Sequence, residues 1–218
     1  MYCRLPLVSI FILLTLSSFG QEEKKKRIEL KNAEVLEYDE SLGHKARRLL
    51  GDVIFEHEGA LMYCDSAYLY EDNSMDAFAN VRINKGDSIK LFCDELNYNG
   101  NTEFAKAKRN VRLEDREMTL TSQKLDYNMA TEQAWYNTGG TLVDNENTLT
   151  SEIGYYYSLF QEMFLKDSVK LVNEKYTLYC DTLRYNTKTE VAFFLGPTRI
   201  ISDENTILCN YGWYDTEL

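Results

Sequence analysis

Residues 177–185 read TLYCDTLRY, a segment in which apolar, β-branched and aromatic residues alternate with polar ones. The next five residues, NTKTE at 186–190, are polar and typical of a turn. An apolar run follows as VAFF at 191–194 and, after Gly196-Pro197, continues as TRII at 198–201. Together these segments predict two strands of about 11 residues joined by a short turn, which is an antiparallel hairpin.

The same unit recurs along the chain at a nearly constant spacing. A small residue marks each copy, and a Tyr or Leu follows it five positions later. The small residues are Ala33, Cys64, Cys93, Ser122, Ser151, Cys180 and Cys209, and the residues that follow are Tyr38, Leu69, Tyr98, Tyr127, Tyr156, Tyr185 and Tyr214. After a first step of 31 residues every later step is 29. A fixed period indicates one supersecondary unit stacked on copies of itself, so a functional surface is expected to be a column through all copies.

The strands are expected to bend, because the apolar side of the first strand changes half-way along each copy. Leu178 and Cys180 have one parity, whereas Leu183 and Tyr185 have the other, and a bulge near Asp181 is the usual way to make such a switch. The second strands carry matching interruptions at Asn80, Asn110, Gly139-Gly140, Ser168 and Gly196-Pro197. Two interruptions per copy at similar heights fold a sheet along a line. The sequence therefore predicts an all-β fold, a repetitive antiparallel meander of long bent strands with about two strands per 29-residue repeat and an apolar inner surface.

The first twenty residues differ from this array. Arg4 precedes an uncharged apolar run at 5–16 and small residues at 18–20, a pattern that predicts a cleaved secretory signal peptide over 1–20. The run is too short to span a bilayer. Residues 21–27 form a polar lead-in, and 28–218 are expected to form one repeat domain. Its last repeat is incomplete, because the sequence stops nine residues beyond Cys209.

Charge and cysteine usage narrow the classes of partner. The formal net charge of −11 argues against binding to nucleic acid, which requires clustered Lys and Arg. No C-x-x-C motif is present and the two histidines are His44 and His57, so neither a metal site nor a cofactor is expected. Cysteines at like positions of successive repeats lie two strands apart, about 9.5 Å, which exceeds the separation of about 7 Å that a disulfide allows. They are expected to act as small apolar residues.

Several segments resemble the OstA/LptA organic-solvent-tolerance family. GDVIFE at 51–56 and NVRLED at 110–115 are similar to its G-N-V-x-[LIF]-x-[DE] strands, as are the Cys-Asp-x-Leu-x-Tyr segments at 93–98 and 180–185. Residues 60–72 look like the form found in Bacteroidetes-type members. The resemblance covers residues 28–218 and implies an open periplasmic β-jellyroll, or β-taco, that holds acyl chains of lipopolysaccharide in its groove. Such proteins belong to the bridge that carries lipopolysaccharide to the outer membrane, and the family has no catalytic residues to transfer.

The first function hypothesis is lipid carriage along the inner column. Candidate lipid-binding residues are Leu36, Tyr38, Leu69, Leu96, Tyr98, Leu125, Tyr127, Tyr156, Leu183 and Tyr185. The expected ligands are the acyl chains of lipopolysaccharide or lipid A, and the expected location is the periplasm, at or near the outer membrane. The alternative is that these side chains close on one another as the filled core of a structural, non-catalytic envelope scaffold. Tyrosine favours a groove mouth, because its hydroxyl needs a polar partner or water.

A second column, on the outer face, is basic and comprises Arg82, Arg112, Lys170 and Arg199. Its functional interpretation is contact with lipid A phosphates. The structural interpretation is cross-strand pairing with the acidic residues of the same face, for example Lys170 with Asp181 and Arg82 with Asp94.

An enzyme is the competing class. Asp65, Asp94 and Asp181 recur in one column, as paired carboxylates do in polysaccharide-acting parallel β-helix enzymes. That fold needs three short strands per coil, whereas this repeat shows two long ones, so no enzyme is expected. The terminal strands near 28–38 and 206–214 are instead expected to be sheet edges that pair end to end, with copies of this chain or with neighbouring β-jellyroll proteins.

Overall fold

The computed structural model describes residues 27–39, 46–86, 89–116 and 118–216. The expected signal peptide and most of the lead-in lie outside these residues. Within them the chain forms sixteen strands of one sheet and a short 3-10 turn, η1. These elements are β1 (Glu29–Asn32), β2 (Val35–Asp39), β3 (Ala46–His57), β4 (Ala60–Tyr70), β5 (Ser74–Lys85), β6 (Ile89–Asn99), β7 (Phe104–Asp115), β8 (Met118–Asn128), β9 (Gln133–Tyr136), β10 (Gly140–Asp144), β11 (Asn147–Ser151), β12 (Ile153–Tyr157), η1 (Ser158–Phe160), β13 (Glu162–Val172), β14 (Tyr176–Asn186), β15 (Val191–Ser202) and β16 (Thr206–Asp215).

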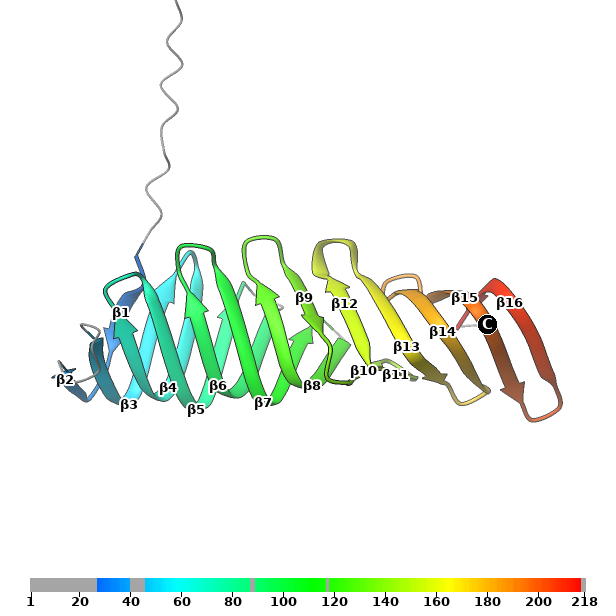
Figure 1. Ribbon diagram of the computed structural model, residues 1–218, viewed down its shortest axis with the longest axis horizontal. Coiled ribbons are helices and arrows are strands. Elements are labelled where there is room, and N and C mark those ends of the chain that lie inside the picture. Colours follow the sequence, from blue (N-terminus) through cyan, green and yellow to red (C-terminus); the bar gives the residue numbers. More distant parts are fainter. Residues whose placement is uncertain (1–26, 40–45, 87–88, 117, 217–218) are drawn as a thin grey trace, which may run out of the picture.

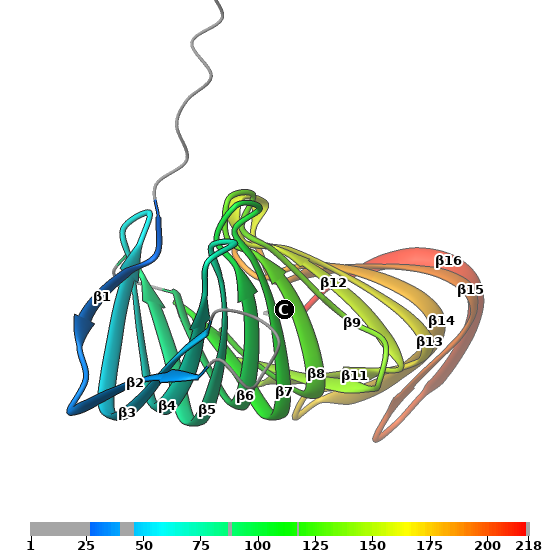
Figure 2. The ribbon, with the colours of Figure 1, turned by 60° about the vertical axis from the view of Figure 1, so that its left-hand side comes forward.

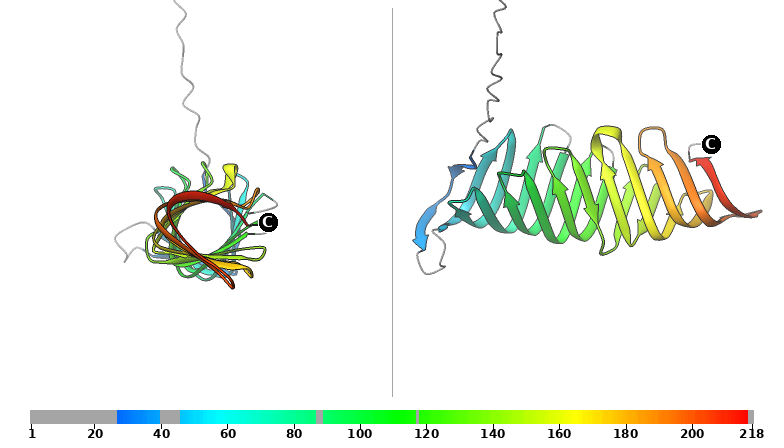
Figure 3. Two further views of the ribbon diagram at one scale, coloured as in Figure 1. Left: turned by 90° about the vertical axis from the view of Figure 1, so that its right-hand side faces the viewer. Right: turned by 45° about the horizontal axis from the view of Figure 1, so that its top comes forward.

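Successive strands pair antiparallel along the long axis, with β1 and β2 at one end and β16 at the other (Figure 1). The main path runs β1-β3-β4-β5-β6-β7-β8-β10-β11-β13-β14-β15-β16, while β2 pairs with β3, and β9 and β12 bridge β8 to β13. Figure 2 shows that the strands curve around this axis, and the end-on view in Figure 3 shows the ribbon as a ring. The predicted all-β meander of hairpins is confirmed.

At the bends of β3, β5, β7 and β13 two consecutive residues adopt left-handed backbone angles, and in β15 Gly196 alone has a positive φ. Ala79 and Asn80 have φ of 61° and 50°, and Arg109 and Asn110 have φ of 62° and 50°. Both residues of a bulge face a single residue of the next strand: the register passes from Phe78↔Glu95 to Val81↔Cys93, which leaves Asp94 opposite the pair. The interruptions expected at Asn80, Asn110 and Ser168 are such bulges, and Gly196-Pro197 lies at a register shift. Gly139-Gly140 instead lies where β9 has ended and β10 begins, and the bulge expected near Asp181 is on the strand opposite, at Gly196.

The bulges invert the inward face of the strands that pair with them. On β6, Leu91 and Cys93 point inward before the switch, and Leu96 and Tyr98 point inward after it. All four side chains are at most 4% exposed. The predicted change of parity is confirmed, and it allows both halves of one strand to bury apolar side chains in the same interior.

Side chains of the acidic column hold the bulges on the outer surface. Asn80 Nδ2 donates to Asp65 Oδ2 at 2.8 Å, and Asn110 Nδ2 donates to Asp94 Oδ2 at 2.7 Å. Asn is one of the few non-glycine residues that tolerate left-handed angles. The carboxylates thus have a structural partner, and the antiparallel pairing rules out the parallel β-helix on which the enzyme hypothesis depended.

The sheet departs from two continuous strands per repeat around Gly140 and Gly154, where β9, β10, β11 and β12 are short pieces. Tyr136 lies between these glycines, and a Cβ added at either would come within 2.4 Å of its ring. Gly154 pairs with Tyr136 in the register between β12 and β9. A large ring inside one strand therefore requires a residue without a side chain on its neighbour.

The same balance of large against small holds elsewhere in the interior. Ala77 and Ala107 flank Leu96, and Phe194 pairs with Gly212. A Cβ added at Gly212 would lie 2.7 Å from the Phe194 ring. The alternation of Leu, Ala and Gly within one sequence column thus follows the volume of the residue on the next strand, as dense packing requires.

We predict that the left-handed bulges contribute measurably to stability. Asn110→Val should lower the free energy of unfolding by about 1–2 kcal/mol, because a β-branched residue is strained at positive φ. Asn110→Gly removes the same hydrogen bond but relaxes the backbone, and should cost less than about 1 kcal/mol. Urea denaturation of both variants tests this, and equal losses would contradict it.

Candidate functional site: the apolar interior and its seam

The candidate lipid-binding residues occupy one interior, with two exceptions. Eight of them are at most 4% exposed and belong to a single apolar cluster: Leu69, Leu96, Tyr98, Leu125, Tyr127, Tyr156, Leu183 and Tyr185. Leu36 and Tyr38 lie on the terminal strand β2 and are 55% and 53% exposed, because no further strand covers them. Lipid contact by any of these residues remains a prediction.

Side chains shield one another from water along the middle of the molecule, whereas its ends are uncovered. At the C-terminal end Ile207 on β16, which pairs with the buried Ile200, is 53% exposed. Leu208, Tyr211 and Trp213 of the same strand are 75%, 78% and 66% exposed and lie on its outer face, where they pair with Arg199, Leu195 and Phe193. Strand β16 pairs only with β15, so one of its sides is free of main-chain partners. The interior is filled with side chains, and its inward residues are exposed only on the terminal strands among the described residues.

The walls of the interior meet along a seam formed by two rows of turns. The first rim consists of the turns at 71–73, 100–103, 129–132, 158–161 and 187–190. The second rim consists of the described turn residues 58–59, 86, 116, 145–146, 173–175 and 203–205. The sheet curls until residues beside one rim hydrogen-bond residues beside the other.

Tyrosines beside the first rim reach across this seam. The hydroxyl of Tyr98 lies 2.8 Å from Nδ1 of His57, 41 residues earlier in the chain. Over the same separation Tyr156 donates to Asp115 Oδ2 at 2.8 Å, and Tyr185 donates to Asp144 Oδ2 at 3.0 Å. The tyrosine is the next-to-last residue of its strand and its partner is the last residue of another. We call these three contacts the latches.

The latches lie in a buried polar network. Burial raises the pKa of the Tyr156 and Tyr185 hydroxyls well above the ordinary value, and the adjacent carboxylates raise it further. The hydroxyls therefore stay protonated and act as donors at physiological pH. Ser158 also donates to Asp115, and Asn147 Nδ2 donates to the Tyr185 hydroxyl at 3.2 Å. Sequence reasoning expected a polar partner for each tyrosine but did not identify it.

The cysteine column points inward and carries no disulfide. Cys64, Cys93 and Cys180 are buried free thiols, and Cys209 is a partly exposed one. Burial raises the pKa of the three buried thiols to about 12. They act as small core residues, as the sequence predicts, and the walls are not cross-linked through them.

On the outer face the basic residues stack on aromatic rings. The Arg82 guanidinium lies 4.2 Å from the centre of the Tyr63 ring, and the Arg112 guanidinium lies 4.2 Å from that of Phe92. Tyr63 pairs with Arg82 and Phe92 with Arg112 across strands. The sequence signal for these stacked pairs is the aromatic residue immediately before each of Cys64 and Cys93, which the pattern of charges alone does not indicate.

The two cross-strand ion pairs named for the basic column are not present, and Arg112 pairs instead with Glu114 on its own strand. Neither Lys170 with Asp181 nor Arg82 with Asp94, all four of which the structure describes, forms an ion pair. Cations of this column face aromatic rings instead: Arg199 and Lys170 lie 5.1 Å and 5.8 Å from the Tyr179 ring centre. The acidic residues are turned toward the bulges.

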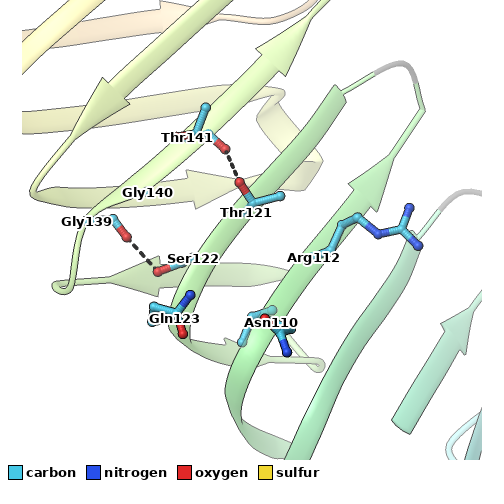
Figure 4. A pocket seen from close by; sticks show the side chains of 9 residues that line it. Asn110, Arg112, Thr121, Ser122, Gln123, Gly139, Gly140 and Thr141 are labelled. Atoms are coloured by element: carbon cyan, nitrogen blue, oxygen red, sulfur yellow. Dashed lines mark hydrogen bonds between the residues drawn. The ribbon is translucent and has the colours of Figure 1, made fainter. Parts of the chain in front are cut away.

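A shallow depression of about 440 Å³ lies on the outer face next to this row (Figure 4). Ser122 Oγ donates to the carbonyl of Gly139 at 2.7 Å, and Thr121 Oγ1 donates to that of Thr141 at 3.3 Å. These hydroxyls tie β8 to the strand that begins at Gly140.

The described residues contain no group of three or more His, Cys, Asp or Glu suited to a metal ion. The described part of the chain also contains no helix with the length and hydrophobicity of a membrane span.

A long antiparallel sheet curled around one apolar interior defines a repetitive β-jellyroll protein. The model of the OstA-like protein family matches residues 25–181, more than half of the sequence, and the chain belongs to this family. Among solved structures the chain is similar to LptH of Pseudomonas aeruginosa, the LptA-homologous periplasmic component of the lipopolysaccharide transport device, at 14% identity. That match covers 61% of this chain and 79% of LptH, with a TM-score of 0.26. No curated protein matches the sequence.

We predict that a latch stabilises the closed interior. Tyr156→Phe removes a buried hydrogen bond to a carboxylate and should lower the free energy of unfolding by about 1.5–3 kcal/mol. Tyr127→Phe is the matched control, because the Tyr127 hydroxyl is buried without a hydrogen-bond partner. Its loss should be neutral or slightly stabilising. Urea denaturation of the two variants measures the difference, and equal effects would show that the latches do not hold the seam.

Proposed function

We propose that the protein is a periplasmic lipid carrier of lipopolysaccharide transport and outer-membrane assembly, and that its interior holds acyl chains. The observation that supports this is an apolar cluster that runs from Leu49 to Ile200 through every repeat. Acyl chains are long, unbranched and apolar, and a stacked column matches them at every level. Membership of the OstA-like family agrees with this function.

Loading requires the seam to part, because the interior is filled with side chains. Burial of an acyl chain of about twelve carbons yields on the order of 10 kcal/mol, whereas breaking one rim hydrogen bond costs about 1–3 kcal/mol. No disulfide between the cysteines at 64, 93, 180 and 209 resists this movement. Lipid burial is therefore large enough to open several latches.

The expected signal peptide and the negative charge fit a periplasmic carrier. Export past the inner membrane places the protein between the two membranes that lipopolysaccharide must cross. The net charge of −11 disfavours general adhesion to anionic membrane surfaces, so transfer depends on specific contacts.

A non-catalytic structural scaffold of the cell envelope is the second candidate. The tight burial of the inner column favours it, since Leu183 and Tyr185 are both 0% exposed. A scaffold keeps this interior dry and filled at all times, whereas a carrier admits lipid to it. The two functions differ in what touches the inward face in the cell.

Photocrosslinking on β6 distinguishes the two functions. Benzoylphenylalanine is placed at Tyr98, which points inward, or at Phe92, which lies on the outer face of the same strand. Irradiation in a Gram-negative host should yield a lipopolysaccharide adduct at Tyr98 and none at Phe92, as detected by mass shift and lipid analysis. Folding of both proteins is checked by circular dichroism. Absence of an adduct at both positions in the folded protein would reject carriage in favour of the scaffold.

We also propose end-to-end association through the terminal strands. Among the described strands β16 has one unpaired side and exposes Ile207 on its inner face, while β2 exposes Leu36 and Tyr38 at the other end. Leu208 and Tyr211 are exposed on the outer face of the same edge strand. A free strand side binds another strand by main-chain hydrogen bonds. Joined ends would extend the apolar column from one molecule into the next, either a copy of this chain or a neighbouring β-jellyroll protein.

Light scattering over a concentration series tests this association. The mean mass of the mature protein should rise with concentration, and Leu208→Lys with Tyr211→Lys should keep it monomeric through charge repulsion at the edge. Tyr155→Lys is the control, because Tyr155 is 45% exposed on β12, which is paired on both sides. It should associate like the wild type. A wild-type protein that stays monomeric at high concentration would contradict self-association.

A further inference from the structure

One position in the row of latches has no latch. Tyr127 occupies the same column as Tyr98, Tyr156 and Tyr185 and is only 1% exposed. Its hydroxyl has no hydrogen-bond partner. The residue 41 positions earlier, where the other three tyrosines find His57, Asp115 and Asp144, is Gly86. Gly86 has no side chain to offer, so the tyrosine latch is missing at this rung, and the rims are tied there by Lys85, whose Nζ donates to the carbonyl of Met129.

The missing side chain reflects open space. A Cβ added at Gly86 would meet no atom within 4 Å, in contrast to Gly140 and Gly154. Gly86 is exposed and has φ of 61°. A side chain could therefore be added at this position without a clash.

The charge at this rung also differs from that of its neighbours. Lys85, the last residue of β5, donates from Nζ to the carbonyl of Met129 on the first rim. At the rung of Tyr156 the last strand residue beside the second rim is Asp115, a carboxylate, where the rung of Tyr127 has Lys85. The rung of Tyr127 thus combines a buried hydroxyl without an acceptor, a glycine in place of the acceptor residue, and a cation as the tie between the rims.

An amphiphile held in the interior needs such a place. Its acyl chain is linked to the head group by an ester or amide carbonyl, and a carbonyl buried at the wall needs a donor. A buried hydroxyl without an acceptor is itself unfavourable by about 1–3 kcal/mol. The two requirements are complementary, and a cation beside them suits an anionic head group.

We propose that the rung formed by Tyr127 and Gly86 is where the polar part of a bound, anionic acylated amphiphile leaves the interior. The Tyr127 hydroxyl donates to the carbonyl at the head of the acyl chain, and Lys85 lies on the side of the head group. This inference rests on the proposed lipid carriage and adds the position at which the seam admits the head group.

Gly86→Asp tests the exit position by supplying the missing latch residue, since Asp tolerates left-handed backbone angles. Gly59→Asp is the matched control: Gly59 lies on the same rim with φ of 76°, and a Cβ there also meets nothing within 4 Å. Affinities of the mature protein are measured for two probes, purified bisphosphorylated lipid A and a pyrenyl alkane that has no head group.

Gly86→Asp should weaken lipid A binding at least about tenfold and change binding of the alkane less than about twofold. Gly59→Asp should change neither by more than about twofold. The proposal is overturned if Gly86→Asp binds lipid A like the wild type, if it weakens both probes equally, or if Gly59→Asp has the same effect.

Tyr127→Phe tests the hydroxyl without altering the rim. It should bind lipid A about three- to tenfold more weakly than the wild type and bind the alkane equally well. Unchanged lipid A affinity in this variant would reject the role of the hydroxyl. If the wild type binds neither probe, lipid carriage itself fails; if the wild type and all variants bind both probes alike, carriage stands and only the exit position is rejected.

Discussion

Successive side chains of a β-strand point to opposite sides, so a bulge in one strand shifts the register by one residue and exchanges the inward face of the strand paired with it. The paired left-handed residues, such as Arg109 and Asn110, provide this exchange. They also bend the sheet at the same height in each repeat. The curl of the sheet and the meeting of its rims depend on these bulges, and the hydrogen bond from Asn110 to Asp94 supports one of them from outside.

Because the sheet curls, side chains from neighbouring strands fill one common interior. Leu96 lies between alanines of the two neighbouring strands, and the rings of Phe194 and Tyr136 fill the space left by glycines. No single residue type is needed at a given level, provided that the summed side-chain volume of the paired residues is kept. This explains how one column can contain Leu, Ala and Gly and still remain continuous and apolar.

The seam is stabilised differently from the apolar interior, because polar side chains are buried there and must hydrogen-bond one another. Asp115, which is 1% exposed, is tolerated since Tyr156, Ser158 and Arg116 all contact its oxygens. Such networks are strong when complete and costly when a member is missing. The rung at Tyr127 lacks its partner, and for this reason it is the part of the seam most suited to receive a polar group from a ligand.

The sequence by itself determined the hairpins, the 29-residue period, the bulge positions and the inward column, because each depends on local alternation and turn chemistry. It also indicated the family, through segments such as 93–98. The latches were decided only by the tertiary structure, since their separation of 41 residues is not the repeat period and depends on how far the sheet curls. The same holds for Leu36 and Tyr38, whose pattern matches the interior but whose strand has no neighbour to cover it. Alternation along a strand specifies which residues share a face; what lies opposite that face depends on the path of the whole sheet.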